Sequence, residues 1–587
     1  MEINFDKLDI QENGTKYNNI EHVYVIDLPF NDAIPTSLDN YFKNEQIDYF
    51  RDYPVVYIVK EKENKKKMSN IYIGESANVK QRMKQHLQIR KSDNFSDTLI
   101  FGCEAFNKSA IYNIESNLIK YIGADQKYKI TNQSQTKQEG MHNYYQKNLY
   151  NDIIFNLIWE ELKNRKIAQS SVEEIKNKDI FKLSPYTVLS PTQLELKNDI
   201  IQFCSTNINE KGVFVVNGEA GSGKSVLLSS LFLSLEELSK DKNSLLNKSN
   251  NFFLVNHNEV LKTYESIASN IPKLKKNKFL KPTSFINKYK NKQDKVDVVV
   301  VDEAHLLLTK QDNFNYFAEE NHLTEIMKIA KKVIVIFDER QVLKGKSYWD
   351  NKKLENIIKE YDKKPNIKKL TEQFRMQVNE DTLDWIETLL DGKISKFPTI
   401  RNNDDYDLRI FPNLKSMHDE IKQRNSDRGL ARVVSTFDFE HKKDDKKYYV
   451  FDHEGTKIVW NTTNSNDTWA ERKETINEAG SIYTIQGFDL NYVGVVIGPS
   501  IKFDSESQRI VVDVDKYKDV EAFRGLGTVK NCNEIKTKII INSLNILLKR
   551  GVHGLYIYAY DDALRKKLLD IQCEDDKYYG LMENYND

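Results

Sequence analysis

Short apolar runs alternate with helix-like patterns from about residue 186 onward. Four runs lie before residue 340, and four more follow after residue 400. Strands of a parallel sheet covered by helices on both faces read as continuous apolar runs, because both of their faces are buried. The pattern therefore predicts two successive α/β lobes. The runs are Val213–Asn217, Phe252–Asn256, Val296–Val301 and Val333–Phe337, then Leu408–Phe411, Ala431–Phe437, Gly494–Ile497 and Gly554–Tyr558.

The chain before residue 186 has a different pattern. Residues 1–50 form an amino-terminal segment with one apolar strand, His22–Leu28. Residues 51–135 carry two strand-like runs followed by two helical patterns, which predict a small α+β domain. Residues 136–185 form a helical connector.

The two lobes are expected at residues 186–370 and 371–587, and the second contains insertions. The insertions are the charged run His441–Lys447 and a strand-like pair near Ile458 and Val511. The fold class is therefore α/β, with a small α+β domain in front of two parallel-sheet lobes.

Composition changes this picture little. A chain of 587 residues is too long for one core, and its 87 basic and 87 acidic residues cancel. A polyanionic partner would need a local basic stripe. Four widely spaced cysteines indicate free thiols in a reducing compartment. Without a secretory signal or an apolar run longer than a core strand, we expect a cytoplasmic protein with no membrane partner.

A glycine-rich loop follows the first strand of the first predicted lobe, and an apolar helix follows the loop. The glycines Gly218, Gly221 and Gly223 let backbone amides point at phosphate oxygens. Lys224 can neutralise the β and γ phosphates of ATP, and the Ser225 hydroxyl can ligate Mg²⁺. The alternative is a chance glycine-rich turn, which the flanking strand and helix argue against.

An acidic pair, Asp302 and Glu303, follows the strand Val296–Val301. Carboxylates at the carboxyl end of such a strand lie beside the phosphate loop. Asp302 is expected to hold Mg²⁺ and Glu303 to polarise the attacking water. Taken alone, the pair could equally be the start of a loop.

The order of motifs from Ser190 to Gly554 resembles a superfamily-one helicase core, and more closely the Schlafen-associated helicase domain. This resemblance implies two RecA-like lobes. It also implies that Gln193 contacts the adenine base, that Gln341 senses the γ-phosphate and that Arg375 is an arginine finger.

The segment Gly480–Asp489 resembles the fifth helicase motif. The resemblance places Gln486, Gly487 and Asp489 at the nucleotide. Asp489 stands where many relatives have glutamate, and its implied role is a ribose contact.

The segment Leu547–Gly551 resembles the sixth motif, whose arginine reaches the γ-phosphate across the cleft. That arginine is Arg550, and Lys549 before it stands where relatives often have threonine. Surface ion pairs are the alternative roles for Arg375 and Arg550.

Residues 54–135 resemble a GIY-YIG endonuclease domain. Val55–Tyr57 stands for the first signature but lacks its glycine, and Tyr72–Gly74 matches the second. A Lys-rich hairpin, Lys60–Lys67, separates them. Arg82 and His86 are four residues apart, so they share one helix face.

Glu115 falls inside an apolar helical stripe, where an unpartnered carboxylate would be costly. The GIY-YIG resemblance implies that it holds one Mg²⁺ or Mn²⁺ ion. It also implies that Tyr57, Tyr72 and His86 activate water and position the phosphate, that Arg82 stabilises negative charge and that Asn132 supports the site. Alternatively, the tyrosines are ordinary strand aromatics and the two basic residues an exposed helix face.

Fewer sequence signals mark the path of a nucleic-acid strand. Asn256–Asn258 and Pro282–Phe285 occupy positions where helicases of this class contact the phosphodiester backbone. The basic run Lys273–Lys278 is either part of that path or a solvated face.

The leading hypothesis is an ATP-dependent motor that moves on nucleic acid and is coupled to a metal-dependent endonuclease. DNA is the expected partner, in bacterial DNA processing or anti-phage defence. One alternative is a nuclease gated by ATP without processive unwinding. Another is a nucleic-acid-binding scaffold with an inactive nuclease lobe. The sequence leaves open DNA against RNA, the direction of travel and assembly into a homo-oligomer.

Overall fold

The structure is a computed structural model, in which the chain divides into two compact units that are described separately below. The first unit comprises Met1–Leu194, Val226–Lys240 and Lys262–Phe279, and the second comprises the rest. The described residues are 2–4, 11–12, 15–16, 22–42, 52–64, 68–89, 94–132, 144–207, 210–292, 296–313, 316–370, 372, 374, 376, 378–398, 406–442, 444, 446–462, 469–485, 488–527 and 531–583.

A six-stranded sheet organises the first unit, in the order β1-β4-β7-β5-β6-β8. All neighbours are antiparallel except β6 and β8, which are parallel. The apolar strand of the amino-terminal segment thus shares its sheet with the strands of the domain that follows. The strands are β1 (Glu2–Asn4), β4 (His22–Pro29), β5 (Val55–Glu61), β6 (Ser69–Ser76), β7 (Phe95–Gly102) and β8 (Tyr128–Ile130), and β2 (Gln11–Glu12) and β3 (Thr15–Lys16) form a separate pair.

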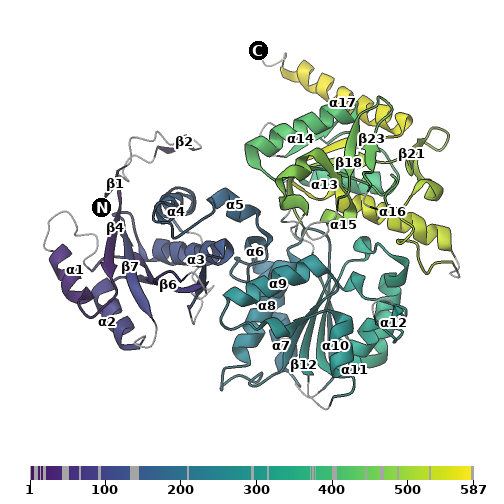
Figure 1. Cartoon of the computed structure of the whole chain (residues 1–587). Coiled ribbons are helices and arrows are strands. Elements are labelled where there is room, and N and C mark those ends of the chain that lie inside the picture. Colours follow the sequence, from purple (N-terminus) through teal and green to yellow (C-terminus); the bar gives the residue numbers. More distant parts are fainter. Residues whose placement is uncertain are drawn as a thin grey trace. The chain divides into compact units, whose positions relative to one another are not determined.

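Helices cover both faces of this sheet (Figure 1). On one face, α1 and α2 pack in a cluster that includes Tyr57 and Met83. On the other face, α3 packs with the helices of the connector, whose Phe155 ring lies 4.6 Å from that of Tyr121. The helices are α1 (Ile34–Phe42), α2 (Val79–Ile89), α3 (Lys108–Asp125), the π-helical turn η3 (Leu149–Ile154), α4 (Phe155–Asn164), α5 (Val172–Asn177) and α6 (Asp179–Lys182).

The first lobe is built on a sheet in the order β11-β10-β12-β13-β9-β14, with β10, β12, β13, β9 and β14 parallel. The four apolar runs predicted from the sequence are confirmed as its strands. Every residue of β10 is buried, as the continuous pattern predicts. The strands are β9 (Gly212–Gly218), β10 (Asn251–Val255), β11 (Phe279–Leu280), β12 (Val296–Asp302), β13 (Ala330–Phe337) and β14 (Asn366–Leu370).

Helices α10, α11 and α12 pack on one face of this sheet, in a cluster with Val213 and Val215. On the opposite face, Phe203 of α7 lies 5.5 Å from Phe214 of β9. The helices of this part of the chain are α7 (Pro191–Ser205), α8 (Lys224–Leu238), α9 (Asn258–Asn270), α10 (Pro282–Tyr289), α11 (His322–Ile329) and α12 (Asn351–Tyr361).

The second lobe is built on a seven-stranded sheet in the order β15-β23-β20-β16-β19-β18-β17. All neighbours are parallel except the edge pair β17 and β18. Its elements are β15 (Asp407–Ile410), β16 (Ala431–Ser435), β17 (Tyr449–Phe451), β18 (Lys457–Trp460), β19 (Glu478–Gly480), β20 (Leu490–Ile497) and β23 (Gly551–Ala559), with α13 (Glu380–Leu390), α14 (Leu414–Arg428), α15 (Ile482–Ile485), α16 (Cys532–Leu548) and α17 (Asp562–Glu583).

The two strand-like runs expected near Ile458 and Val511 are both strands, and they lie in different sheets. Ile458 lies on β18, which joins the main sheet beside β19. Val511 lies on β22 (Arg509–Val512), which forms a separate hairpin with β21 (Ile501–Asp504). Both strands are short, and a pattern of a few residues does not specify a partner.

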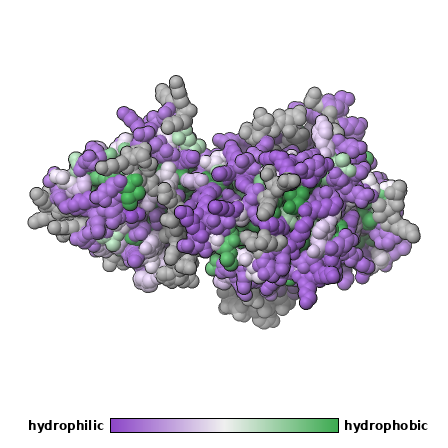
Figure 2. Space-filling view, turned by 90° about the horizontal axis from the view of Figure 1, so that it is seen from below, coloured by the Kyte–Doolittle hydropathy of each residue, from purple (hydrophilic) through white to green (hydrophobic). Residues whose placement is uncertain are grey.

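On the face drawn in Figure 2, hydrophilic residues dominate and hydrophobic ones form small, separate groups. Within the described part of the chain, none of the helices has the length and apolar character needed to cross a membrane.

Candidate active sites

The glycine-rich loop of the first lobe lies between β9 and α8 and folds around its own lysine. Gly221 and Gly223 have φ angles of 87° and 73°, a region that side chains rarely adopt, so glycine is needed at both positions. Lys224 Nζ donates to the carbonyl oxygens of Gly218 and Glu219, at 2.8 and 2.7 Å. A Cβ on Gly218 would lie 3.0 Å from the Lys224 side chain, so this glycine leaves room for it.

Asp338 ties this loop to the end of the neighbouring strand β13. Its Oδ2 accepts from Lys224 Nζ at 3.3 Å and from Gln341 Nε2 at 2.7 Å. Its Oδ1 accepts from the backbone nitrogen of Arg340 at 3.0 Å and thereby caps the 3-10 turn η7 (Glu339–Gln341). Asp338, which the sequence motifs did not single out, connects the predicted residues Lys224 and Gln341.

The acidic pair lies at the end of β12, as predicted. Asp302 is 1% exposed, and its Oδ1 accepts from the backbone nitrogen of Glu303 at 2.9 Å. Glu303 has a φ angle of 51°, and its Oε2 lies 3.4 Å from Nδ1 of His305. A non-glycine residue in this strained region is common at functional sites.

Arg550 of the second lobe is buried between α16 and β23, so its alternative role as an exposed surface ion pair does not fit. Its Nη1 donates to the carbonyl oxygen of Phe488 at 3.0 Å and lies 4.0 Å from Oδ1 of Asp489. At the start of the same lobe, the backbone nitrogen of Phe374 donates to the Gly221 carbonyl of the loop at 2.8 Å. Three further predicted residues, Arg375, Gln486 and Gly487, lie outside the described residues.

The buried His305 lies near charged groups from both lobes. Burial lowers the pKa of this fully enclosed imidazole, and the charges of Glu303 and Asp338 oppose that shift. The positive charges of Lys224 and Arg550 lower the pKa further. One side chain can feel all four charges only if they lie close to it, because charge effects decay with distance. The sequence motifs did not single out His305.

Gln193 has a structural role in the described residues. Its side-chain Oε1 accepts from the backbone nitrogen of Ser190 at 3.0 Å, and Ser190 Oγ accepts from the backbone nitrogen of Gln193 at 3.2 Å. These reciprocal bonds form a capping box at the start of α7. The predicted base contact stays a prediction.

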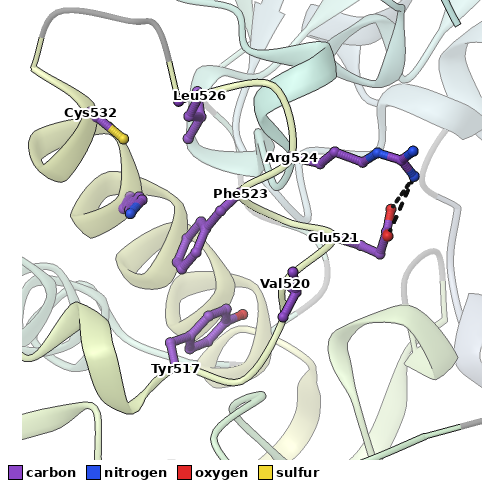
Figure 3. A pocket seen from close by; sticks show the side chains of 9 residues that line it. Tyr517, Val520, Glu521, Phe523, Arg524, Leu526 and Cys532 are labelled. Atoms are coloured by element: carbon purple, nitrogen blue, oxygen red, sulfur yellow. Dashed lines mark hydrogen bonds and ion pairs between the residues drawn. The ribbon is translucent and has the colours of Figure 1, made fainter.

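The two lobes are also joined at a loop of the second lobe, residues 517–527. The Gly345 backbone nitrogen donates to the Ala522 carbonyl at 2.8 Å, and Lys310 Nζ donates to the Gly525 carbonyl at 2.9 Å. Between this loop and α16 lies a pocket of about 430 Å³, where Figure 3 shows the Tyr517 and Phe523 rings and the ion pair of Arg524 with Glu521. None of its lining residues belongs to a predicted site.

The predicted nuclease residues meet around one hydroxyl group in the first unit. Tyr57 Oη on β5 lies 2.7 Å from His86 Nε2 and accepts from Arg82 Nε at 3.0 Å. Arg82 Nη2 donates to Tyr72 Oη at 3.4 Å, and the rings of the two tyrosines stack with their centroids 6.2 Å apart.

Burial distinguishes this site from an open helix face. His86 is 5% exposed, so the alternative of an open helix face is wrong for it. Burial raises the pKa of Tyr57 far above its usual range, so its hydroxyl stays protonated.

Gly74 explains why the second signature ends in glycine. It pairs with Tyr57 on the neighbouring strand, and a Cβ there would collide with the tyrosine's ring and hydroxyl. Val55 stands where the first signature has glycine, and it is fully buried in the cluster that also contains Tyr57. The core therefore accommodates the valine without displacing the tyrosine.

Glu115 lies on the buried side of α3, with Leu118 and Ile122, as the apolar stripe predicts. Its negative charge contributes to the raised pKa of Tyr57, which places it near the hydroxyl. The side chain of Asn132 bonds both backbone groups of Ile73 on β6, at 3.2 and 2.7 Å.

No group of three or more His, Cys, Asp or Glu suited to a metal occurs among the described residues. One buried carboxylate still suits Mg²⁺, which often takes only one or two protein carboxylates together with water and phosphate.

The residues expected along a nucleic-acid strand make internal contacts. Asn256 Nδ2 donates to the Leu306 carbonyl at 2.7 Å, and Thr283 Oγ1 lies 3.0 Å from His322 Nε2. Phe285 is fully buried in the core of the first lobe. Lys273 pairs with Glu237 at 2.8 Å.

Two family models match the chain and agree with this architecture. Residues 211–561 match the Schlafen group 3, DNA/RNA helicase domain, and residues 53–129 match the GIY-YIG catalytic domain. The uncharacterized protein YPL245W of Saccharomyces cerevisiae is 37% identical over 417 residues, which cover 66% of this chain and 92% of the yeast protein. The crystal structure of Pif1 helicase from Candida albicans matches 65% of this chain and 97% of its own, with 14% identity and a TM-score of 0.28.

The helicase match spans more than half of the 587 residues and includes both lobes. The nuclease match covers the strands and helices that carry Tyr57, Tyr72, Arg82 and His86. A helicase and a nuclease domain together imply a nucleic-acid partner. The chain belongs to the Schlafen group 3 DNA/RNA helicase domain family and carries a GIY-YIG catalytic domain in front of its helicase domain.

Proposed function

We propose that the chain is an ATP-driven motor on nucleic acid whose GIY-YIG domain cuts the strand with the help of a divalent metal. One observation carries the proposal. The second lobe contacts the glycine-rich loop of the first, because the Phe374 backbone nitrogen donates to the Gly221 carbonyl at 2.8 Å. The charges of Lys224, Glu303 and Arg550, which come from both lobes, also act on the buried His305. The loop that would bind the phosphates and the arginine that would stabilise their charge therefore belong to different lobes. A nucleotide bound between them would draw the lobes together.

Residues of the first lobe would bind the phosphates. Backbone amides of the loop from Gly218 to Gly223 suit the phosphate oxygens, and Lys224 would neutralise their charge. Ser225 and Asp302 would hold Mg²⁺, which supplies charge neutralisation when bound. Glu303 would orient and polarise the attacking water.

Other residues would complete the site. Gln341, fixed by Asp338 next to Lys224, would respond to the γ-phosphate. Arg550 and Arg375 would stabilise charge on the transferring phosphoryl group. Gln193, Gln486, Gly487 and Asp489 would contact the base and ribose side of the nucleotide.

In the nuclease domain, the neutral Tyr57 hydroxyl would take a proton from the water that attacks the phosphate and give its own proton to Nε2 of His86, 2.7 Å away. Arg82 would stabilise the negative charge that develops on that phosphate. Tyr72 would position the substrate through its contact with Arg82. Glu115 would hold one Mg²⁺ or Mn²⁺ ion, which supplies Lewis acidity when bound.

DNA is the proposed substrate, and its setting the bacterial cytoplasm, where a motor fused to a nuclease suits DNA processing or defence against phage. The fusion of the two domains supports the coupling of motor and nuclease, since a motor can deliver a strand to a nuclease on the same chain.

A strand-displacement assay on a partial DNA duplex tests the motor. We expect ATP-dependent displacement by the wild type and none by Lys224→Ala. Lys359→Ala, which removes an exposed α12 lysine that pairs with Glu355 on the same helix, should behave as the wild type. ATP hydrolysis without displacement would replace the motor with an ATP-gated nuclease.

A substrate panel tests the nuclease. Single-stranded, duplex and forked DNA and RNA would be incubated with Mg²⁺ or Mn²⁺, with and without ATP. We expect DNA cleavage that Glu115→Ala abolishes. Absence of cleavage on every substrate would favour a nucleic-acid-binding scaffold.

A further inference from the structure

We propose that Glu387 is a positioning residue that couples the two lobes at the ATP site, by joining the neighbour of Gln341 in one lobe to the neighbour of Arg550 in the other. This inference rests on the proposed ATP hydrolysis. Glu387 lies on α13, outside every motif that pointed to the site.

Helix α13 holds Glu387 rigidly within the second lobe. Asn379 caps its start by accepting from the Thr382 backbone nitrogen at 2.9 Å. Trp385, Ile386 and Leu389 on the same helix are buried in the large core cluster of that lobe. A carboxylate on a helix anchored by these residues has a defined position.

The Glu387 carboxylate bridges two cations. Its Oε1 bonds Nζ of Lys549, and its Oε2 bonds Nη1 of Arg340. Burial on its own would raise the pKa of Glu387, but Lys549 and Arg340 outweigh burial and lower it. Lys549 is 4% exposed, so Glu387 also neutralises a buried charge.

Each cation is directly attached to a proposed ATP-site residue. Arg340 lies between Glu339 and Gln341 in η7, and its backbone nitrogen bonds the same Asp338 that holds Lys224 and Gln341. Lys549 immediately precedes Arg550. One carboxylate therefore sets the distance between the phosphate-sensing turn and the arginine of the opposite lobe.

A second set of contacts holds the two lobes together without Glu387. On α16, Asn542 Nδ2 donates to the carbonyl oxygens of Val342 and Glu339 at 2.9 and 3.2 Å, and Lys538 pairs with Glu339. Loss of Glu387 should therefore alter the alignment of the site while the interface and nucleotide binding remain. A misplacement of about 1 Å can cost about a hundred-fold in rate.

The test measures ATP hydrolysis with a single-stranded oligonucleotide, together with binding of a fluorescent ATP analogue and the thermal midpoint. For Glu387→Gln we expect kcat to fall at least about tenfold while KM and the analogue's Kd change less than about threefold, the pattern of a lost transition-state interaction. Glu420→Gln is the matched control, because Glu420 also lies between two cations, Arg409 and Arg424, but on α14. It should keep the wild-type kcat.

The double variant Glu387→Gln, Lys549→Thr separates positioning from charge burial. Removing the buried cation should restore the thermal midpoint that Glu387→Gln lowers, while kcat stays low. Recovery of kcat together with the midpoint would overturn the proposal, and so would a wild-type kcat in Glu387→Gln. If the wild type hydrolyses ATP and Lys224→Ala does not, either result leaves the proposed ATP site standing. A wild type that hydrolyses no ATP would overturn both.

Discussion

The two candidate active sites are assembled in opposite ways. The nuclease centre takes its tyrosines, arginine and histidine from two adjacent strands and the next helix, Tyr57 to His86, within one packed unit. The proposed ATP site takes its groups from Gly218 to Arg550, and these groups lie on two lobes. The first site is complete once its domain folds. The second depends on the relative position of the two lobes, and a motor needs a site with that property.

The two sites also differ in their electrostatics. Around the Tyr57 hydroxyl, burial keeps a neutral group neutral by raising its pKa. Charges of both signs act on the buried His305, where Glu303 and Asp338 raise its pKa and Lys224 and Arg550 lower it. A site of opposed charges responds strongly to a phosphate that arrives or leaves, whereas a network of hydrogen bonds around a neutral hydroxyl stays in place.

The largest expected effect falls on the ATP site. Lys224→Ala removes the cation that the loop carbonyls and Asp338 hold, and should reduce ATP hydrolysis by roughly a thousand-fold or more. Cleavage of single-stranded DNA measured without ATP should be unchanged. A parallel loss of ATP-free cleavage would show that the two sites are not independent.

The reciprocal variant is Tyr57→Phe. It removes the hydroxyl that contacts His86 and Arg82 while keeping the ring that fills the core. Cleavage should fall by about a hundred-fold, the scale of a lost proton-transfer group. ATP hydrolysis, followed by phosphate release, should match the wild type. Cleavage at the wild-type rate would remove Tyr57 from the mechanism.

Glu115→Gln tests the metal at the nuclease centre. Because an amide is a weaker ligand than a carboxylate, the Mn²⁺ concentration for half-maximal cleavage should rise on the order of tenfold to a hundred-fold. The titration would be run on single-stranded DNA without ATP. An unchanged titration curve would mean that Glu115 does not hold the metal.

The smallest effect is expected for Gly74→Ala. The added methyl group would push the Tyr57 ring away from His86 and Arg82 and should lower cleavage by about tenfold. Gly527→Ala is the control, since nothing lies within 4 Å of a Cβ at that position. Wild-type cleavage by Gly74→Ala would show that the tyrosine position is not critical.

Local signals in the sequence predicted most of the fold. Buried parallel strands have continuous apolar runs, and the phosphate loop is a contiguous motif between a strand and a helix. The pairing of β18 with β19 was missed, because the four residues of β18 carry no signal for their partner.

The candidate sites were predicted only in part, for a related reason. Asp338, His305 and Glu387 acquire their roles from partners more than a hundred residues away or on the other lobe. Lys549, which stands where relatives often have threonine, pairs with Glu387 of α13. Such contacts arise from tertiary packing, which a linear motif does not encode.

The central claim is that one nucleotide is held by both lobes. The most direct test is a structure of the protein with Mg²⁺ and a non-hydrolysable ATP analogue. We predict that Lys224 and Arg550 both lie within hydrogen-bonding distance of the terminal phosphate, with Gln341 beside them. A bound analogue that contacts Lys224 but leaves Arg550 on its Phe488 carbonyl would contradict the claim.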